Sequence, residues 1–146
     1  LQSADPVLVV VQLGANDALR GQNLGATADN LTAMVNACQA AGARVLLAGI
    51  ELPPNYGARY TQRLRAVYRD VAAATGAALM PFLLADIATD RALFQPDGLH
   101  PTAAGLERVA DAVARAIGTH FSLAGPRAPG GTSEAAAPAA SAQTSE

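Results

Sequence analysis

Near the carboxyl end of the sequence, an aspartate precedes a histidine by three residues in the stretch FQPDGLHPT, from Phe94 to Thr102. On one turn, the carboxylate of Asp97 can accept the Nδ1 proton of His100, which leaves Nε2 free to act as a base. Such a pair would supply two members of a hydrolytic triad. Taken alone, the same residues also suit an ordinary turn, because Asp and Gly often occupy turns.

Two further stretches could contribute to a site. The first, GAND, contains Asn16 and directly follows an apolar run. It is either a strand-ending turn or a loop whose Asn16 amide can donate a hydrogen bond to an oxyanion. The second, ELPPNYG from Glu51 to Gly57, follows the next apolar run and is either a stiff connector or one wall of a binding groove.

Metal and nucleotide chemistry are not indicated. The side chains of Asp97, His100, Glu107 and His120 lack the spacing of a metal site, and the lone Cys38 excludes an internal disulfide. No glycine-rich phosphate-binding motif follows an expected strand. We therefore expect no metal and no other cofactor.

Composition limits the partners. The 146 residues suit one compact domain, and 51% hydrophobic residues support a packed core. The net charge is −2 and the ten basic residues, all arginine, are scattered, which argues against a nucleic-acid partner. No apolar run approaches the ~20 residues of a membrane span. A small molecule is the expected partner.

Short apolar runs alternate with amphipathic segments along the chain. The expected strands are Val7–Leu13, Arg44–Ile50 and Ala78–Leu84. The expected helices are Ala28–Ala41, which Thr27 caps, Ala58–Thr75, a short turn over 85–93, and a last helix that Thr102 caps and that ends near Ile117. The buried face of this last helix should consist of Leu106, Val109, Ala110, Val113 and Ile117. The alternation predicts an α/β fold with a parallel sheet in three layers, and ligands of such sheets bind outside the carboxyl ends of the strands.

The order of these stretches resembles a known family. GAND after the first strand, LPPNYGARY after the second, and PDGLHPTAAG before the last helix are together similar to the SGNH, or GDSL, hydrolases. The likeness is to the branch of arylesterases, thioesterase I and lysophospholipases, and it covers about Val7 to Ile117. It implies a flavodoxin-like, three-layer fold and a serine esterase or thioesterase that hydrolyses acyl esters or thioesters.

The resemblance also assigns roles to residues. It implies that Asn16 is the side-chain oxyanion donor of the family's third block, and that Asp97 and His100 are the acid and base of its fifth. The segments 18–25 and 52–57 correspond to positions that line the acyl-binding groove in this branch. Leu19, Arg20 and Tyr56 are therefore candidate substrate contacts.

The family's nucleophile is absent from this sequence. No Gly-Asp-Ser follows a strand, the second-block glycine is missing, and none of Ser3, Ser122, Ser133, Ser141 and Ser145 lies at a strand-to-helix turn. We interpret the chain as the carboxy-terminal portion of a longer hydrolase, lacking the first strands and inactive alone. The alternative is a non-catalytic, flavodoxin-like domain that binds a small ligand.

The two ends carry weaker signals. Residues 1–123 are the expected folded portion, and the Ala/Pro/Ser-rich residues 124–146 are an expected disordered tail. No signal peptide is visible from Leu1 onward. Members of this family are often exported, so a periplasmic or secreted location would depend on a leader outside this sequence.

Overall fold

The structure is a computed structural model that describes residues 4–121, so the predicted boundary after residue 123 lies outside the described part. Its strands are β1 (Leu8–Val11), β2 (Arg44–Ala48) and β3 (Ala78–Met80). Its helices are α1 (Ala15–Leu19), α2 (Leu24–Ala40), α3 (Ala58–Thr75) and α4 (Ala103–His120), with short 3-10 helices η1 (Pro54–Tyr56) and η2 (Arg91–Leu93). Within residues 4–121, no helix is both long and apolar enough to cross a membrane.

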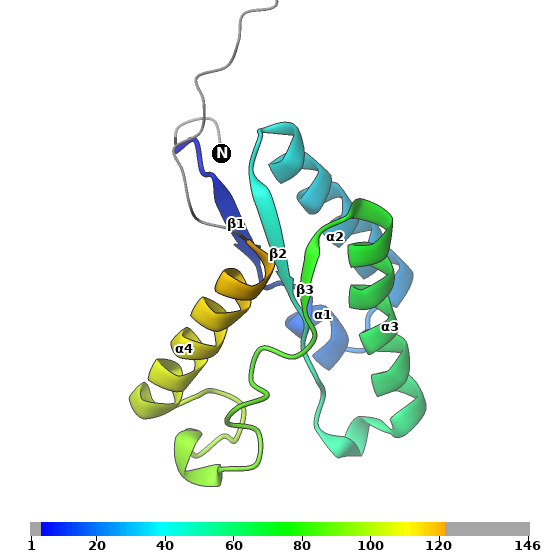
Figure 1. Cartoon of the computed structure of the whole chain (residues 1–146). Coiled ribbons are helices and arrows are strands. Elements are labelled where there is room, and N and C mark those ends of the chain that lie inside the picture. Colours follow the sequence, from blue (N-terminus) through cyan, green and yellow to red (C-terminus); the bar gives the residue numbers. More distant parts are fainter. Residues whose placement is uncertain (1–3, 122–146) are drawn as a thin grey trace, which may run out of the picture.

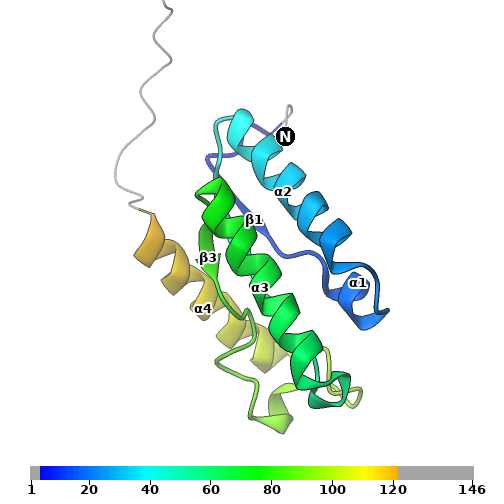
Figure 2. The same cartoon turned by 90° about the vertical axis from the view of Figure 1, so that its right-hand side faces the viewer.

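The three strands form a parallel sheet in the order β1-β2-β3. Val9 of β1 lies opposite Val45 of β2, and Leu47 of β2 lies opposite Leu79 of β3. Helices α2 and α3 cover one face of the sheet and α4 covers the other (Figure 1 and Figure 2). The predicted three-layer α/β architecture is confirmed.

The central strand is buried on both faces, because successive side chains of a strand point to opposite sides. Val45 and Leu47 belong to the core cluster formed with α2 and α3. Leu46 belongs to the opposite cluster, with Ala112 of α4. This two-sided burial explains why the strand appears in the sequence as an uninterrupted apolar run.

All three strands are shorter than predicted. The third was expected to reach Leu84 but ends at Met80. Pro81 follows directly and has no backbone N–H to continue the ladder. Residues 85–93 form turns and η2 in place of one helical turn.

Helix α2 begins earlier than predicted, and Thr27 is not its cap. The side chain of Asn23 accepts a hydrogen bond from the Gly25 N–H at 2.8 Å and caps the helix. Asn caps a helix as well as Thr does, and starting at Leu24 adds a buried apolar side chain. Thr27 lies inside the helix, 2% exposed.

Helix α4 begins where predicted, because the Thr102 hydroxyl accepts a hydrogen bond from the Gly105 N–H at 3.2 Å. The prediction that Leu106 and Ala110 are buried is wrong, since both are exposed. Val109, Val113 and Ile117 of the predicted face do contact the core, and Ala112 joins them. Leu106 lines an open cavity at the carboxyl ends of the strands.

Candidate active site

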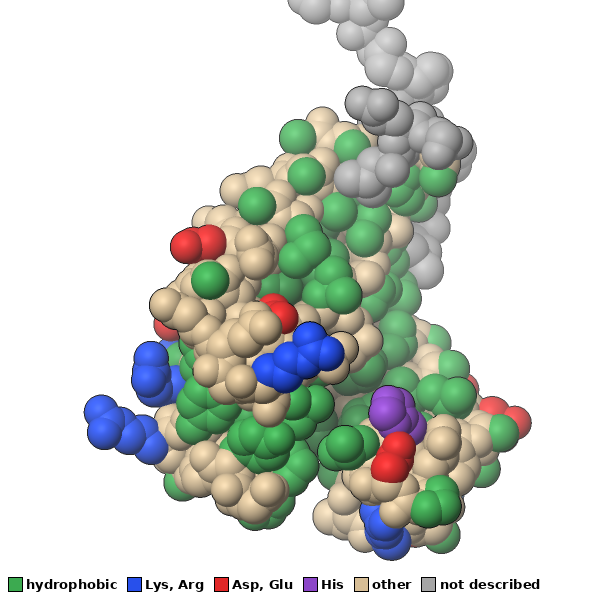
Figure 3. Space-filling view, turned by 180° about the vertical axis from the view of Figure 1, so that it is seen from behind, with side chains coloured by type: hydrophobic (Ala, Val, Ile, Leu, Met, Phe, Trp, Pro, Cys, Tyr) green, Lys and Arg blue, Asp and Glu red, His purple; other side chains and the backbone are tan. Residues whose placement is uncertain are grey.

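A cavity of about 490 Å³ lies beyond the carboxyl ends of the strands. Gln12 follows β1, Ile50 follows β2 and Phe82 follows β3, and all three line it. Asn16 and His100 line the same cavity. In Figure 3, hydrophobic side chains line a hollow in the surface, with a histidine beside an acidic side chain at its rim.

The predicted acid and base are in contact. The Oδ2 atom of Asp97 lies 2.7 Å from Nδ1 of His100. The other carboxylate oxygen, Oδ1, accepts hydrogen bonds from the backbone N–H groups of Leu99 at 2.9 Å and His100 at 3.1 Å. The hydrogen bond from His100, followed by those from the two backbone groups, holds the pKa of Asp97 far below its usual range.

The ionised carboxylate of Asp97 determines which ring nitrogen of His100 carries the proton. Because the carboxylate accepts at Nδ1, the neutral imidazole carries its proton there and presents Nε2 as an acceptor. The side chain of His100 is 72% exposed and lines the cavity, so Nε2 is accessible to a reacting group.

The turn between Phe94 and Pro101 is held by its own backbone. The Gln95 N–H donates to the His100 carbonyl at 2.7 Å, and a bridge pairs Phe94 with Pro101. From outside the turn, the Arg91 guanidinium donates to the Pro96 carbonyl at 2.9 Å. The Asp97–His100 pair therefore sits on a loop that is closed by its own backbone hydrogen bonds and held from outside by Arg91.

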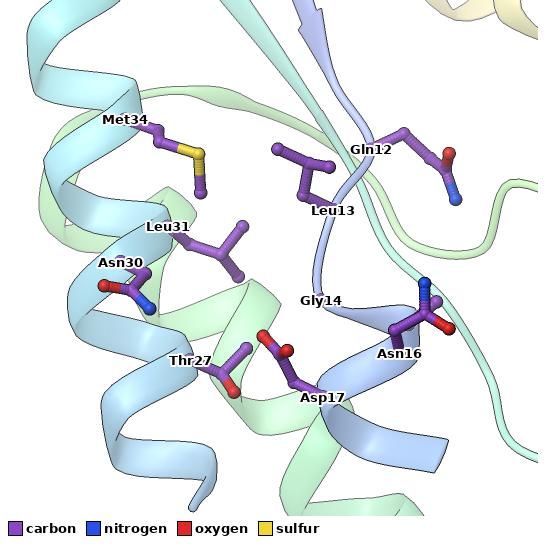
Figure 4. Close-up of a pocket in the computed structure, with 10 residues that line it drawn as sticks. Gln12, Leu13, Gly14, Asn16, Asp17, Thr27, Asn30, Leu31 and Met34 are labelled. Carbon is purple, nitrogen blue, oxygen red and sulfur yellow. The ribbon is translucent and has the colours of Figure 1, made fainter. Parts of the chain in front are cut away.

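The GAND stretch is the start of a helix as well as a turn. Gly14 has a φ of 101° and caps α1, which begins at Ala15. Figure 4 shows the side chain of Asp17 pointing toward Thr27 of α2, whereas the amide of Asn16 lies on the other side of α1, toward Gln12. This direction places Asn16 on the cavity that His100 also lines.

Of the three predicted substrate contacts, one lies at the cavity and two do not. Leu19 lines the cavity, whereas Arg20 and Tyr56 are not among its lining residues. Arg20 is exposed at the end of α1, and the Tyr56 hydroxyl donates to the Leu19 carbonyl at 3.1 Å. Contacts of Arg20 and Tyr56 with a substrate stay predictions.

The sequence interpretation missed most of the apolar wall. Leu52 lines the cavity and lies in the segment 52–57 that the family resemblance placed at the groove, whereas Phe82, Leu83 and Leu99 line it without having been predicted to do so. Phe82 and Leu83 follow a strand end and Leu99 precedes His100, so their positions were an available signal. Among residues 4–121, no group of three His, Cys, Asp or Glu side chains is placed to hold a metal ion.

Comparison with known proteins identifies the family. The chain matches the GDSL-like lipase/acylhydrolase family over residues 1–108. It is 43% identical over 113 residues to esterase TesA of Pseudomonas aeruginosa, covering 77% of this chain and 56% of TesA. It is 34% identical over 117 residues to thioesterase 1/protease 1/lysophospholipase L1 of Escherichia coli K12, covering 80% of this chain and 56% of that protein.

The fold matches as well. The crystal structure of the psychrotrophic esterase EstA from Pseudoalteromonas sp. has a TM-score of 0.77 and 38% identity, covering 82% of this chain and 65% of EstA. This chain belongs to the GDSL-like lipase/acylhydrolase family. It spans a little over half the length of the curated relatives named above. The predicted family is confirmed.

Proposed function

We propose that this chain supplies the acid, the base and one oxyanion donor of a serine hydrolase that cleaves acyl esters or thioesters. The observation that carries the proposal is the 2.7 Å hydrogen bond between Asp97 and His100 beside a cavity that Asn16 also lines. The esterase and thioesterase activities named for the relatives support it. The inhibition of EstA by monoethylphosphonate supports it too.

Each of the three residues has a distinct part in the reaction. Nε2 of His100 takes the proton of a serine hydroxyl as its oxygen attacks the acyl carbonyl carbon. The negative charge of Asp97 stabilises the imidazolium, and the amide of Asn16 donates a hydrogen bond to the oxyanion. His100 then gives the proton to the departing alcohol or thiol, and water releases the acyl group with His100 again as base.

We infer that the nucleophilic serine and the second-block glycine come from polypeptide outside this sequence. Residues 4–121 contain no serine, and the chain covers 56% of TesA. The longer protein that includes them is called the complete enzyme below. The present chain should then be inactive by itself.

The cavity favours an apolar acyl group. Leu19, Leu52, Phe82 and Leu83 contribute hydrocarbon surface to its wall. Burial of an acyl chain there would gain roughly 0.8 kcal/mol for each methylene removed from water. We propose Leu19 as a substrate contact on this basis.

The test uses a fluorophosphonate probe, which labels an activated serine. The complete enzyme should be labelled at one serine outside this sequence, and the present chain should not be labelled. Labelling of this chain at any of its own serines would contradict the proposal. A complete enzyme that resists the probe but binds a small ligand at the sheet edge would favour the non-catalytic alternative.

A further inference from the structure

The three tyrosines of the chain all contact the segment that carries Asn16. Each hydroxyl donates a hydrogen bond to a backbone carbonyl: Tyr68 to Leu13 at 2.7 Å, Tyr60 to Ala18 at 3.1 Å, and Tyr56 to Leu19 at 3.1 Å. The acceptors lie on both sides of Asn16 in the chain. We name Tyr56, Tyr60 and Tyr68 the tyrosine clamp.

Helix α1 needs such support because it is short. Its five residues are far fewer than an isolated helix needs for stability in water. The last carbonyls of a helix also lack partners within the helix. The Tyr56 hydroxyl donates to the Leu19 carbonyl, and the Tyr60 hydroxyl donates to the Ala18 carbonyl, which also accepts from the Gly21 N–H at 3.0 Å.

The clamp packs into one of the hydrophobic core clusters. Tyr60 and Tyr68 lie on α3, which forms one core cluster with α2 and the sheet, and Tyr56 lies on η1 just before it. Tyr68 is 2% exposed. Burial, and to a lesser degree the charge of Asp17, raises the pKa of Tyr68 to about 12, so its hydroxyl stays a neutral donor at ordinary pH.

The hydrogen bond from the Tyr68 hydroxyl to the Leu13 carbonyl depends on the absence of a side chain at Gly14. A Cβ at Gly14 would lie 2.7 Å from the Tyr68 hydroxyl oxygen and 3.1 Å from Cγ2 of Thr27. Only a residue without a side chain therefore leaves room for this hydroxyl to reach the Leu13 carbonyl. The turn into α1 and the clamp are fitted to each other.

We propose that the tyrosine clamp positions Asn16 by fixing α1, so that its amide is held toward the reacting carbonyl. The inference rests on the proposed function of Asn16 as an oxyanion donor. Such a donor contributes to the transition state only when it is fixed in place beforehand. The three tyrosines are positioning residues, because they act through α1 and need not touch the substrate.

Amide hydrogen exchange on the present chain tests whether the clamp holds α1. The amides of Ala18, Arg20 and Gln22 donate hydrogen bonds within this segment and report its opening. Tyr56→Phe and Tyr60→Phe should each speed their exchange about 5-fold, since a hydrogen bond contributes ~1 kcal/mol. Exchange in β2 should not change.

Thr61→Val is the matched control. Its hydroxyl donates to the Gly57 carbonyl at 3.1 Å, so the hydrogen bond removed lies on the same helix but does not reach α1. Exchange of the α1 amides in Thr61→Val should equal that of the parent chain. Unchanged exchange in both tyrosine variants would overturn the clamp.

Kinetics of the complete enzyme test whether the clamp serves Asn16. Tyr60→Phe should lower kcat about 5-fold with KM within about 2-fold, and combining it with Tyr56→Phe should lower kcat further. Thr61→Val should leave both constants unchanged. A purely structural role would reduce the folded fraction and leave kcat per folded molecule unchanged.

The two experiments separate the possible failures. Faster α1 exchange with an unchanged kcat would show that the tyrosines hold α1 without positioning a catalytic group, and would overturn the inference. A complete enzyme that hydrolyses no ester would overturn the proposed function and the catalytic role of the clamp together. The exchange experiment would still decide whether the tyrosines hold α1.

Discussion

Asn16 and Asp17 are neighbours in the chain and both line the pocket drawn in Figure 4, but only Asn16 also lines the cavity that His100 lines. On α1 the side chain of Asp17 points toward α2, whereas the Asn16 amide lies on the opposite side (Figure 4). A rotation of about 100° per residue separates successive side chains of a helix. The short helix after Gly14 therefore directs one polar group to the cavity and the next one away from it.

The variant Asn16→Ala distinguishes an oxyanion donor from a turn residue. In the complete enzyme, its kcat should fall by roughly 10² to 10³ with KM little changed, because the lost hydrogen bond forms in the transition state. Steady-state kinetics measure the change in kcat and KM, and thermal melting measures any change in stability. Asn30→Ala is the control, since Asn30 is also an exposed helical asparagine but lies on α2, outside the cavity that Asn16 and His100 line.

A different result would reassign the residue. If Asn16→Ala lowers the melting midpoint and leaves kcat per folded molecule within a few-fold of the parent, Asn16 serves the turn and not the reaction. An equal loss of kcat in Asn30→Ala would mean that the effect is not specific to the cavity.

At the scale of single residues, the sequence predicted contacts between near neighbours in the chain better than contacts between residues far apart in it. The contact between Asp97 and His100 was predictable because three residues on one turn bring the two side chains together. The bond from Tyr56 to the Leu19 carbonyl was not, because its partners are 37 residues apart and meet only through the packing of α3. Tyr56, which was predicted to contact the substrate, is therefore hydrogen-bonded through its hydroxyl to the backbone of α1.

Helix α1 is also where local prediction failed at the scale of elements. Its five residues carry no long apolar periodicity, so the sequence indicated a turn where a short helix forms. Helix α3 matched its predicted bounds, Ala58–Thr75, because its buried residues repeat at helical spacing and Gly76 ends it in a left-handed conformation.

The variant Gly14→Ala tests the fit between α1 and the clamp. Gly14 has a φ of 101°, where an alanine costs roughly 1–2 kcal/mol, and the new Cβ would also collide with the Tyr68 hydroxyl. Gly21→Ala is the matched control, because Gly21 has a φ of 66° but a Cβ there would have no neighbouring atom within 4 Å.

Both variants should lose stability by the conformational cost, and Gly14→Ala should lose a further 1–3 kcal/mol or so from the collision. Urea unfolding of the two variants and the parent chain measures the difference. Equal losses would mean that Tyr68 can move aside freely, which would also weaken the argument for a rigid clamp.

For the whole molecule, the alternation of apolar runs and amphipathic helices sufficed to predict the layers. Because β2 is buried on both faces, it appears in the sequence as a continuous apolar run. Helices α2, α3 and α4 each appear as apolar residues repeated at helical spacing, which form their buried faces. The cavity wall was harder to foresee, because it is assembled from single residues after three separate strands. Leu106 illustrates this, since its place on an apolar stripe predicted burial, yet it lies 55% exposed beside the cavity.

Apolar side chains are exposed along the outer edge of β1 and next to its two ends. Within residues 4–121, β1 pairs only with β2, so its other side presents unpaired backbone groups. Val7, Val10 and Leu13 at this edge are 56%, 40% and 53% exposed. A neighbouring hollow between β1 and α2 is lined by apolar residues such as Met34 and Ala37. Exposed apolar strand edges are templates for pairing with another chain.

We therefore expect the present chain to self-associate through β1, with an average mass that rises with concentration in sedimentation or light-scattering measurements. Val10→Lys should reduce this association, because a charged side chain at a strand edge opposes pairing with a second copy. Its effect on the free energy of unfolding should be small, since Val10 is 40% exposed. Leu106→Lys is the control: it places the same charge at another exposed apolar position, away from β1, and should leave association unchanged. A chain that stays monomeric at every concentration, or an equal effect of the two lysines, would mean that β1 is not the surface through which copies meet.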